Sequence, residues 1–230
     1  MYENVKKSPT EIYGLKYRPS LEPEYSDDVD KIQEFFKLKK RLGRGITVQE
    51  ADLFRKEFLK IKDNCKCILE IGVAWKAGES FAISRNTTKI LLEEKNPNTL
   101  YLGVDLGNRT FINNPDKNIY TIQTDSRNRE MVMNFLRKKG IFEIDFLFID
   151  GFHSVNITVN DWQYSEYLSK NGIIGLHDIA VHPGSYVVFD AINEQLFHKK
   201  KYFEKDIESM GIAIMKRKLT AAGYKAHSLY

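Results

Sequence analysis

From Cys65 onward the sequence alternates short apolar runs with amphipathic segments, and this alternation constrains the fold more than any other feature. Short apolar runs are typical of buried strands, and apolar residues three or four positions apart are typical of helices. The expected strands are residues 65–72, 99–105, 119–123, 144–150 and 172–178, and the expected helices are 80–94, 127–139, 156–169 and 187–197. Such alternation predicts an α/β chain with a doubly wound, mostly parallel sheet.

Both ends of the chain extend this core. Thr47 and Glu50 have the spacing of a capping box, which predicts a helix through Ile61, and another helix is expected at 27–43. Asn171 and Gly172 form a turn pair that is expected to end the helix before the fifth strand. Two late runs, 201–208 and 211–218, are expected to form an antiparallel pair at the sheet edge.

The expected organisation has three parts. They are an N-terminal arm with helices at 1–62, serving as a lid or a dimer contact, a ligand-binding domain at 63–218, and a loose tail at 219–230. If the arm is a dimer contact, we expect the dimer to be a homodimer.

Composition narrows the class of protein. The formal net charge is +4, from 35 basic and 31 acidic residues, and the basic residues form no stripe, so no nucleic-acid partner is expected. No apolar run approaches the roughly 18 residues that span a bilayer, and no secretory signal is visible, so we expect a cytoplasmic protein with no membrane partner. Cys65 and Cys67 are expected to be buried, reduced thiols.

The turn after the first expected strand contains small residues. Glu70 and Gly72 end the strand, and Gly78 and Ser80 begin the next helix. Small residues at this place let the backbone approach a nucleotide-type ligand. The alternative is that the two glycines only permit a tight turn between strand and helix.

Polar residues also end the second and third expected strands. Asp105 is placed to accept hydrogen bonds from ribose hydroxyls, and Asp125 and Ser126 follow the third strand at the same edge of the sheet. The alternative for Asp125 or Ser126 is that it caps the following helix.

The fourth and fifth expected strands bring carboxylates and imidazoles to that edge. Asp150 and His153 follow the fourth strand, and His177 and Asp178 end the fifth. The alternative is that these groups cap neighbouring helices, but two adjacent strands with such endings favour a functional role for at least two of the four. Asp161 lies eight residues after His153 on the next expected helix.

These motifs resemble a known family. The segment DFLFIDGFHSVNITVNDWQYSEYLSKNGIIGLHDI is similar to the signature of class I S-adenosylmethionine (SAM) dependent methyltransferases of the methyltransferase-24 type, which are relatives of small-molecule and sugar O-methyltransferases. ILEIG, LGVD and VVFDAINEQL…MGIAIMKRK resemble the family's other motifs, so the resemblance covers residues 65–218. It implies a Rossmann-like, seven-stranded sheet with an antiparallel C-terminal edge strand and makes 63–218 a SAM-binding domain.

The resemblance implies roles for individual residues. Those that would contact SAM are Glu70, Gly72, Gly78 and Ser80 near the methionine end, Asp105 at the ribose, Asp125 and Ser126 beside the adenine, and Asp150. In metal-dependent relatives the last two strand ends hold a divalent cation such as Mg²⁺ or Mn²⁺, and here those places fall on Asp150, His177 and Asp178.

The chain departs from the family pattern in two places. Extra residues, including Trp75 and Lys76, separate the glycines of the first turn, which is expected to reshape the cofactor loop. His177 stands where a carboxylate is common, and an imidazole ligand shifts preference from Mg²⁺ toward transition metals.

The catalytic residues expected from this resemblance are His153, His177 and Asp150. His153 is the first choice of general base for an acceptor hydroxyl, because an ordinary imidazole titrates near 6.5; the alternative is that it caps a helix or bonds Asp178. The acceptor implied by the family is a sugar, a glycan or another polar small molecule. Tyr13, Tyr17, Tyr25 and Trp162 are candidates to line its site, although Trp162 suits plain packing equally well.

Three other functions remain open at this stage. An NAD-dependent oxidoreductase shares the strand and acidic-residue pattern, but the G-x-G-x-x-G spacing is absent. A nucleic-acid-binding protein and a catalytically inactive partner subunit with the SAM fold are the other two.

Overall fold

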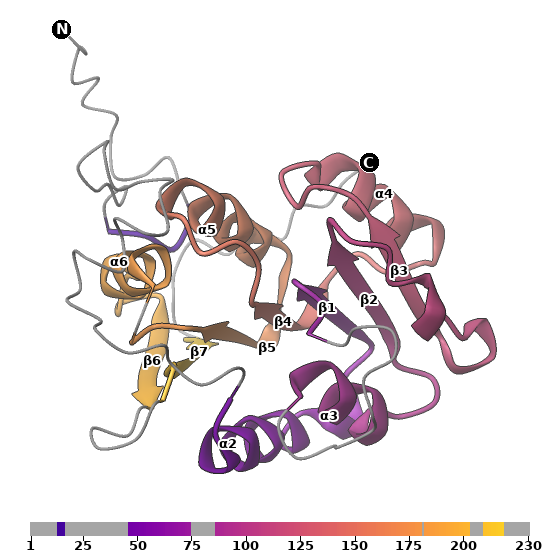
Figure 1. The fold of residues 1–230 in the computed structure, drawn as a ribbon, viewed down its shortest axis with the longest axis horizontal. Helices are drawn as coiled ribbons and strands as arrows, with labels where there is room; N and C mark the ends of the chain where they lie inside the picture. Colours follow the sequence, from indigo (N-terminus) through magenta and orange to yellow (C-terminus); the bar gives the residue numbers. More distant parts are fainter. Residues whose placement is uncertain (1–12, 17–45, 75–85, 181, 203–208, 219–230) are drawn as a thin grey trace, which may run out of the picture.

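A seven-stranded sheet forms the centre of the computed structural model, which describes residues 13–16, 46–74, 86–180, 182–202 and 209–218 (Figure 1). The strands are β1 (Cys67–Ile71), β2 (Leu100–Asp105), β3 (Ile119–Gln123), β4 (Ile144–Ile149), β5 (Leu168–His177), β6 (Phe197–Tyr202) and β7 (Ile212–Arg217). Their order is β3-β2-β1-β4-β5-β7-β6, and β7 runs antiparallel to both of its neighbours. The predicted mostly parallel, doubly wound sheet is confirmed.

Helices cover both faces of this sheet (Figure 1). They are α2 (Val48–Leu59), α3 (Thr87–Glu94), α4 (Arg129–Lys138), α5 (Val155–Trp162) and α6 (Pro183–Ala191), with short 3-10 helices η3 (Lys62–Asn64), η5 (Thr110–Ile112), η6 (Pro115–Lys117) and η7 (Gln163–Tyr167). Apolar side chains of α2 and α3 share one core with the sheet, and those of α4, α5 and α6 share the other. On the first face, the Phe54 ring packs edge-on against Phe146 and Phe148 at centroid distances of 5.5 and 4.7 Å.

The strand order reverses beside β1, and this reversal positions the site. The chain runs from β1 outward to β2 and β3 and then returns to β4 on the other side of β1. Connections leave the carboxyl ends of β1 and β4 in opposite directions, which opens a crevice between them. Open α/β sheets bind ligands in such crevices.

Two parts of the predicted N-terminal arm are described, and both pack against the sheet layer. The capping box of Thr47 and Glu50 is confirmed at the start of α2. Glu50 is also buried, and its Oε1 accepts hydrogen bonds from Ser209 Oγ and from the Gly211 N–H at 2.8 Å. Leu15 pairs with Ile192 after α6. The expected helix at 27–43 and the tail at 219–230 lie outside the described residues, and the domain boundary at 62 stays a prediction.

The predicted boundary between the helix at 156–169 and the fifth strand is wrong. The helix expected at 156–169 ends as η7, and β5 begins at Leu168, so Asn171 and Gly172 lie inside a strand instead of forming a turn. The Leu168 side chain lies over Gly172, where a Cβ would come within 2.6 Å of Leu168 Cγ. Packing between β4 and β5 therefore outweighs the local turn propensity of Asn171 and Gly172.

The segments after β5 also begin earlier than expected. The helix predicted at 187–197 is α6, which starts at Pro183, where the fixed φ of proline suits a first helical turn. The edge strand predicted at 201–208 overlaps β6 only at Lys201 and Tyr202, and residues 203–208 lie outside the described residues. β6 contains three consecutive lysines. Charged side chains are common on edge strands because they oppose pairing with other chains. The antiparallel strand, β7, lies between β5 and this edge strand.

Cys65 and Cys67 are free and buried, as predicted. Within the described ranges, every helix is too short or too polar to cross a membrane.

Candidate functional site

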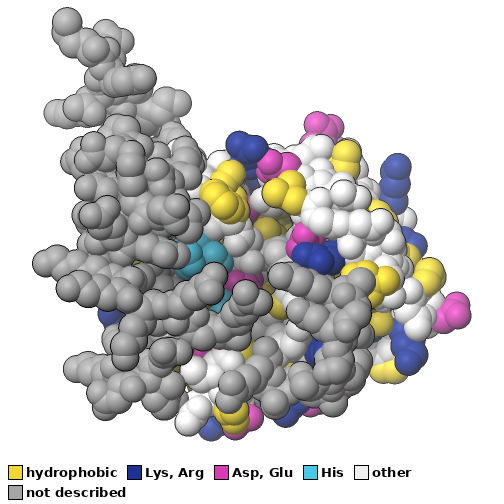
Figure 2. All heavy atoms as spheres, viewed as in Figure 1, with side chains coloured by type: hydrophobic (Ala, Val, Ile, Leu, Met, Phe, Trp, Pro, Cys, Tyr) yellow, Lys and Arg dark blue, Asp and Glu magenta, His cyan; other side chains and the backbone are white. Residues whose placement is uncertain are grey.

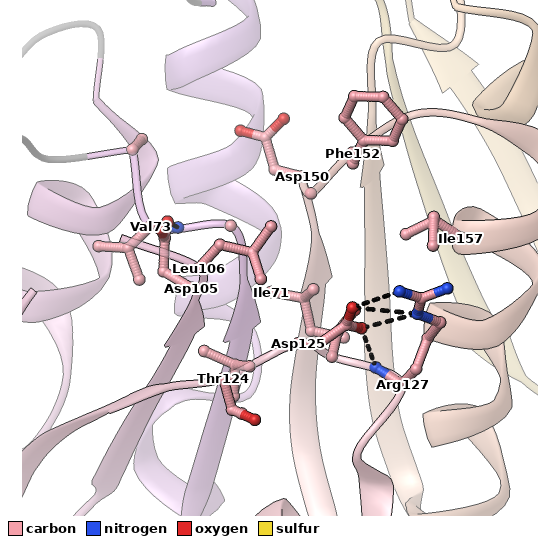
Figure 3. A pocket seen from close by; sticks show the side chains of 15 residues that line it. Ile71, Val73, Asp105, Leu106, Thr124, Asp125, Arg127, Asp150, Phe152 and Ile157 are labelled. Atoms are coloured by element: carbon pink, nitrogen blue, oxygen red, sulfur yellow. Dashed lines mark hydrogen bonds and ion pairs between the residues drawn. The ribbon is translucent and has the colours of Figure 1, made fainter. Parts of the chain in front are cut away.

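A pocket of about 630 Å³ lies at the carboxyl ends of β1, β2, β3 and β4 (Figure 3). We call it the strand-end pocket. It is lined by Ile71, Gly72, Val73, Ala74, Val104, Asp105, Leu106, Thr124, Asp125, Ser126, Arg127, Asp150, Gly151, Phe152 and Ile157. Mostly apolar walls with a few converging polar groups, at this volume, are typical of sites for small organic ligands.

The floor of the pocket depends on Gly72. Its φ is +83°, and a Cβ there would lie 2.0 Å from the carbonyl oxygen of Asp150. Only glycine lets the chain leave β1 this close to the end of β4. The Gly72 N–H donates to the Val104 carbonyl at 2.9 Å, so the turn is also fixed to β2.

Asp105, at the end of β2, is held by backbone amides. Its Oδ2 accepts from the Val73 N–H at 2.9 Å, and its Oδ1 accepts from the Gly107 N–H at 2.6 Å. Arg109 Nε lies 3.3 Å from Oδ2. Each carboxylate oxygen has further lone pairs, so Asp105 can still accept hydrogen bonds from a ligand.

The opposite wall carries a second acidic residue. The Arg127 guanidinium donates to both carboxylate oxygens of Asp125, at 2.6 to 3.0 Å, as the dashed lines in Figure 3 show. These hydrogen bonds from Arg127 lower the pKa of Asp125. Next to them, the Ser126 carbonyl accepts from Tyr164 Oη at 2.7 Å. The turn after β3 is therefore anchored to η7 by a hydrogen bond from a large buried side chain.

A second group of polar side chains adjoins the pocket, and we call it the His–Asp cluster: Asp150, His153, His177, Asp178 and His182. His177 Nδ1 lies 2.9 Å from Asp150 Oδ1 and 2.9 Å from Asp178 Oδ1. His153 Nε2 lies 2.9 Å from Asp178 Oδ2 and 3.4 Å from Asp150 Oδ1. Figure 2 shows histidine side chains gathered on the face in view. Two carboxylates are thus shared between two imidazoles.

Charge pairing dominates the protonation of this cluster. Burial lowers the pKa of His153, but the carboxylates of Asp178 and Asp150 outweigh it and raise that pKa to about 9. The same balance raises the pKa of His177. Burial alone would raise the pKa values of Asp150 and Asp178, and the neighbouring imidazoles lower both instead. Each carboxylate thus favours the protonated form of the neighbouring imidazoles, and each imidazole favours the ionised form of the carboxylates.

The loop and helix after β5 complete the cluster. Asp178 has a φ of +61°, which turns the chain directly after the strand. The His182 ring stacks on His153 with centroids 4.9 Å apart, and Ser185 Oγ lies 3.1 Å from His153 Nδ1. At Gly184 a Cβ would lie 2.2 Å from the His153 carbonyl oxygen, so glycine permits this close contact. A single stretch of chain, 150–185, supplies every member.

Comparisons with known proteins bear on the fold. No protein-family model and no curated protein matches this sequence. Among solved structures, the MycE methyltransferase of the mycinamycin biosynthetic pathway, in complex with Mg, SAH and mycinamycin VI, is 14% identical with a TM-score of 0.53; the match covers 86% of this chain and 57% of MycE. An rRNA methylase from Streptococcus thermophilus is 12% identical with a TM-score of 0.51, covering 74% of this chain and 95% of the methylase.

The chain has the fold of class I SAM-dependent methyltransferases. A putative rRNA-methylase from Clostridium thermocellum agrees, at 14% identity and a TM-score of 0.50, covering 71% of this chain and 95% of that one. The chain spans just over half of the length of MycE.

The methyltransferase fold brings most of the predicted site residues to one crevice. Those that line the strand-end pocket are Gly72, Asp105, Asp125, Ser126 and Asp150. His153, His177 and Asp178 lie in the adjoining cluster, which Asp150 shares with the pocket. Gly78 and Ser80, with Trp75 and Lys76, lie outside the described residues.

Other predicted residues lie elsewhere. Glu70 is fully buried beneath α3 and does not line the pocket. Trp162 is also fully buried, and its Nε1 donates to the Tyr13 carbonyl at 2.8 Å, while the Tyr13 ring packs against Phe197. The packing alternative for Trp162 therefore holds. Tyr17 and Tyr25 lie outside the described residues.

Sequence reasoning missed His182 and Arg109, which complete the surroundings of Asp178 and Asp105. His182 Nε2 lies 3.6 Å from Asp178 Oδ2, and the i,i+4 spacing of the two residues was a signal available in the sequence. Arg109 has the same spacing from Asp105. Neither of these pairs lies within a regular helix, so the periodicity of the helices did not indicate that the two residues of a pair are in contact.

Proposed function

We propose that this protein is a SAM-dependent methyltransferase that transfers a methyl group to a hydroxyl of a sugar or another polar small molecule. The observation that carries the proposal is the position of Asp150, which lines the strand-end pocket and also contacts His153 and His177. A cofactor in the pocket would therefore lie directly beside a group of acids and bases. Methyl transfer to a hydroxyl needs this juxtaposition, because the acceptor loses a proton as it attacks.

The pocket suits the adenosine part of SAM. Asp105 can accept from ribose hydroxyls, and Leu106 and Ile157 offer apolar surface for a flat base, with Asp125 and Ser126 at its edge. When bound, SAM supplies an activated methyl group. This chain's residues then have three tasks, which are to orient the cofactor, to place the acceptor and to take up its proton.

The cluster also suits a divalent cation. Donor atoms of Asp150, His177 and Asp178 all lie within 4.8 Å of one another. Ligands about 2.1 Å from one ion lie roughly 3 to 3.5 Å apart, and the contacts of His177 with the two carboxylates are both 2.9 Å. A bound ion would supply a Lewis acid to lower the pKa of an acceptor hydroxyl. A nitrogen ligand favours Mn²⁺ or another transition metal over Mg²⁺.

His153 is the proposed base. Because its pKa is about 9, the ring carries a proton at neutral pH and must lose it before it can accept another. We therefore expect methyl transfer by the metal-free protein to accelerate as pH rises toward 9. His177 is the second choice, since it lies deeper and both of its carboxylate contacts are short.

Calorimetric titration of chelator-treated protein with S-adenosylhomocysteine (SAH) tests the proposal, with NAD⁺ titrated in parallel. Saturable binding of SAH, and none of NAD⁺, is the expected result. Binding of NAD⁺ alone would favour the oxidoreductase. SAH binding without methyl transfer to any of a panel of sugars and polyhydroxylated small molecules, with Mn²⁺ or Mg²⁺ present, would favour a catalytically inactive partner subunit.

A further inference from the structure

Glu70 is a fully buried carboxyl group with three hydroxyl neighbours. Thr88 Oγ1 donates to its Oε2 at 2.9 Å, and Thr87 Oγ1 donates to its Oε1 at 3.3 Å. Tyr101 Oη donates to Oε2 as well. These groups come from the first turn of α3 and from the neighbouring strand β2, so Glu70 joins three elements beneath the strand-end pocket.

Thr88 connects this buried group to the pocket. The Ala74 N–H donates to Thr88 Oγ1 at 3.0 Å, and Ala74 lines the pocket. The two preceding amides are used in the same way, since Gly72 donates to the Val104 carbonyl and Val73 donates to Asp105 Oδ2, both at 2.9 Å. Three successive backbone amides of one pocket wall are therefore fixed by the protein itself.

Gly103 provides the space for this arrangement. It faces Glu70 in the pairing of β1 with β2, and a Cβ there would lie 3.0 Å from Tyr101 Oη and 2.7 Å from Val73 Cγ2. Without a side chain at 103, the Tyr101 hydroxyl reaches Glu70 and Val73 packs into the wall. The same glycine thus serves both the buried carboxyl group and the wall above it.

We propose that Glu70 is a positioning residue that holds the wall formed by Gly72, Val73 and Ala74 through Thr88, and that it makes no direct contact with the cofactor. The proposal rests on the proposed function, because it assigns the wall to SAM. Burial raises the pKa of Glu70 to about 8 against the hydrogen bonds from Tyr101, Thr88 and Thr87.

Thr88→Val tests the connection, because it keeps the shape of the side chain but removes the acceptor for the Ala74 amide. We expect its Kd for SAH to rise about fivefold, the effect of one net hydrogen bond, and Thr88→Ser to restore the affinity. Thr87→Val is the matched control. It removes a hydroxyl from the same carboxyl group without touching the wall, so its Kd should rise less even where its Tm falls equally.

A second ligand separates positioning from direct contact. 5′-Methylthioadenosine keeps the adenosine and the thioether of SAH but lacks the amino-acid group. If Glu70 acts through the wall, Glu70→Gln and Thr88→Val change the Kd values for the two ligands in the same proportion to each other. If Glu70 contacts the ammonium, Glu70→Gln weakens SAH relative to 5′-methylthioadenosine but Thr88→Val does not, and the proposal is overturned.

Equal losses in Thr87→Val and Thr88→Val, with matching falls in Tm, would also overturn it, since both would then act through stability. Either result leaves SAH binding by the unaltered protein in place. Absence of that binding would instead overturn the proposed function, and the positioning role with it.

Discussion

The strand-end pocket and the His–Asp cluster meet at Asp150, but they hold their carboxylates in different ways. Asp105, in the pocket, accepts from two backbone amides, whose donors never change charge. In the cluster, Asp178 faces imidazoles of His153 and His177, which can gain or lose a proton or give way to a cation. One crevice thus combines a fixed binding surface with a group of side chains whose charge is exchangeable.

Asp105→Ala is the strongest test of the strand-end pocket as a fixed binding surface. The change removes the expected ribose acceptor and also the partner of the Val73 and Gly107 amides, so we expect the Kd for SAH to rise about 100-fold. Calorimetry measures it, with Asp116→Ala, at an exposed carboxylate on η6, as the control. An unchanged Kd would mean that Asp105 only shapes the turn.

Asp178→Asn tests whether the strand-end pocket and the His–Asp cluster bind their ligands independently. Asparagine tolerates the positive φ of this residue, so the turn should survive. We expect affinity for Mn²⁺ to fall at least about tenfold, whereas the Kd for SAH stays within error, because Asp178 does not line the pocket. A parallel loss of SAH binding would show that cluster and pocket act as one unit.

The His–Asp cluster should also make the stability of the folded protein depend on pH. The folded pKa of His153, about 9, lies above the ordinary value of 6.5, so its stabilisation is complete below pH 6.5 and is lost as pH rises through 9. We expect the Tm in chelator to fall by several degrees between pH 6.5 and 9.5.

His153→Gln should flatten this dependence. Glu70 contributes a fall of the same sign, since its pKa is also raised on folding, to about 8. Glu70→Gln therefore serves as the comparison. An equally steep fall in His153→Gln would assign the titration to a group other than His153, and within the cluster His177 is the other histidine with a raised pKa.

The smallest effect is expected at Arg127. Its ion pair with Asp125 is short, but the two side chains are 58% and 37% exposed. Exposed pairs are worth about 0 to 1 kcal/mol, so Arg127→Ala should change the Kd for SAH by less than about threefold. A larger change in calorimetry would indicate that the guanidinium itself contacts the ligand.

The two halves also differ in how far the sequence predicts them. Strand ends were located correctly because β1, β2 and β4 are buried on both faces and appear as continuous apolar runs. That placed Asp105, Asp125 and Asp150 at one edge. The direction of a side chain is harder to infer, and Glu70 shows why: at the end of a fully buried strand, adjacent residues face opposite sides of the sheet.

The remaining errors come from contacts between distant segments. Asn171 and Gly172 have turn propensity, yet pairing with β4 places them in β5. His182 meets His153 only because α6 packs closely over the loop after β4, which the absent side chain of Gly184 allows. Neither contact has a periodic signature in the sequence.

The members of the His–Asp cluster lie close together in the sequence. All of its members lie in a single stretch, 150–185, whereas the pocket draws its walls from segments as far apart as Ile71 and Ile157. A recombination event that exchanged this stretch would replace the whole group of acids and bases and leave the ends of β1, β2 and β3 untouched. Descendants of such a chain would keep the part of the pocket formed by the ends of β1, β2 and β3, and would acquire a different group of acids and bases together with the adjoining wall at 150–157.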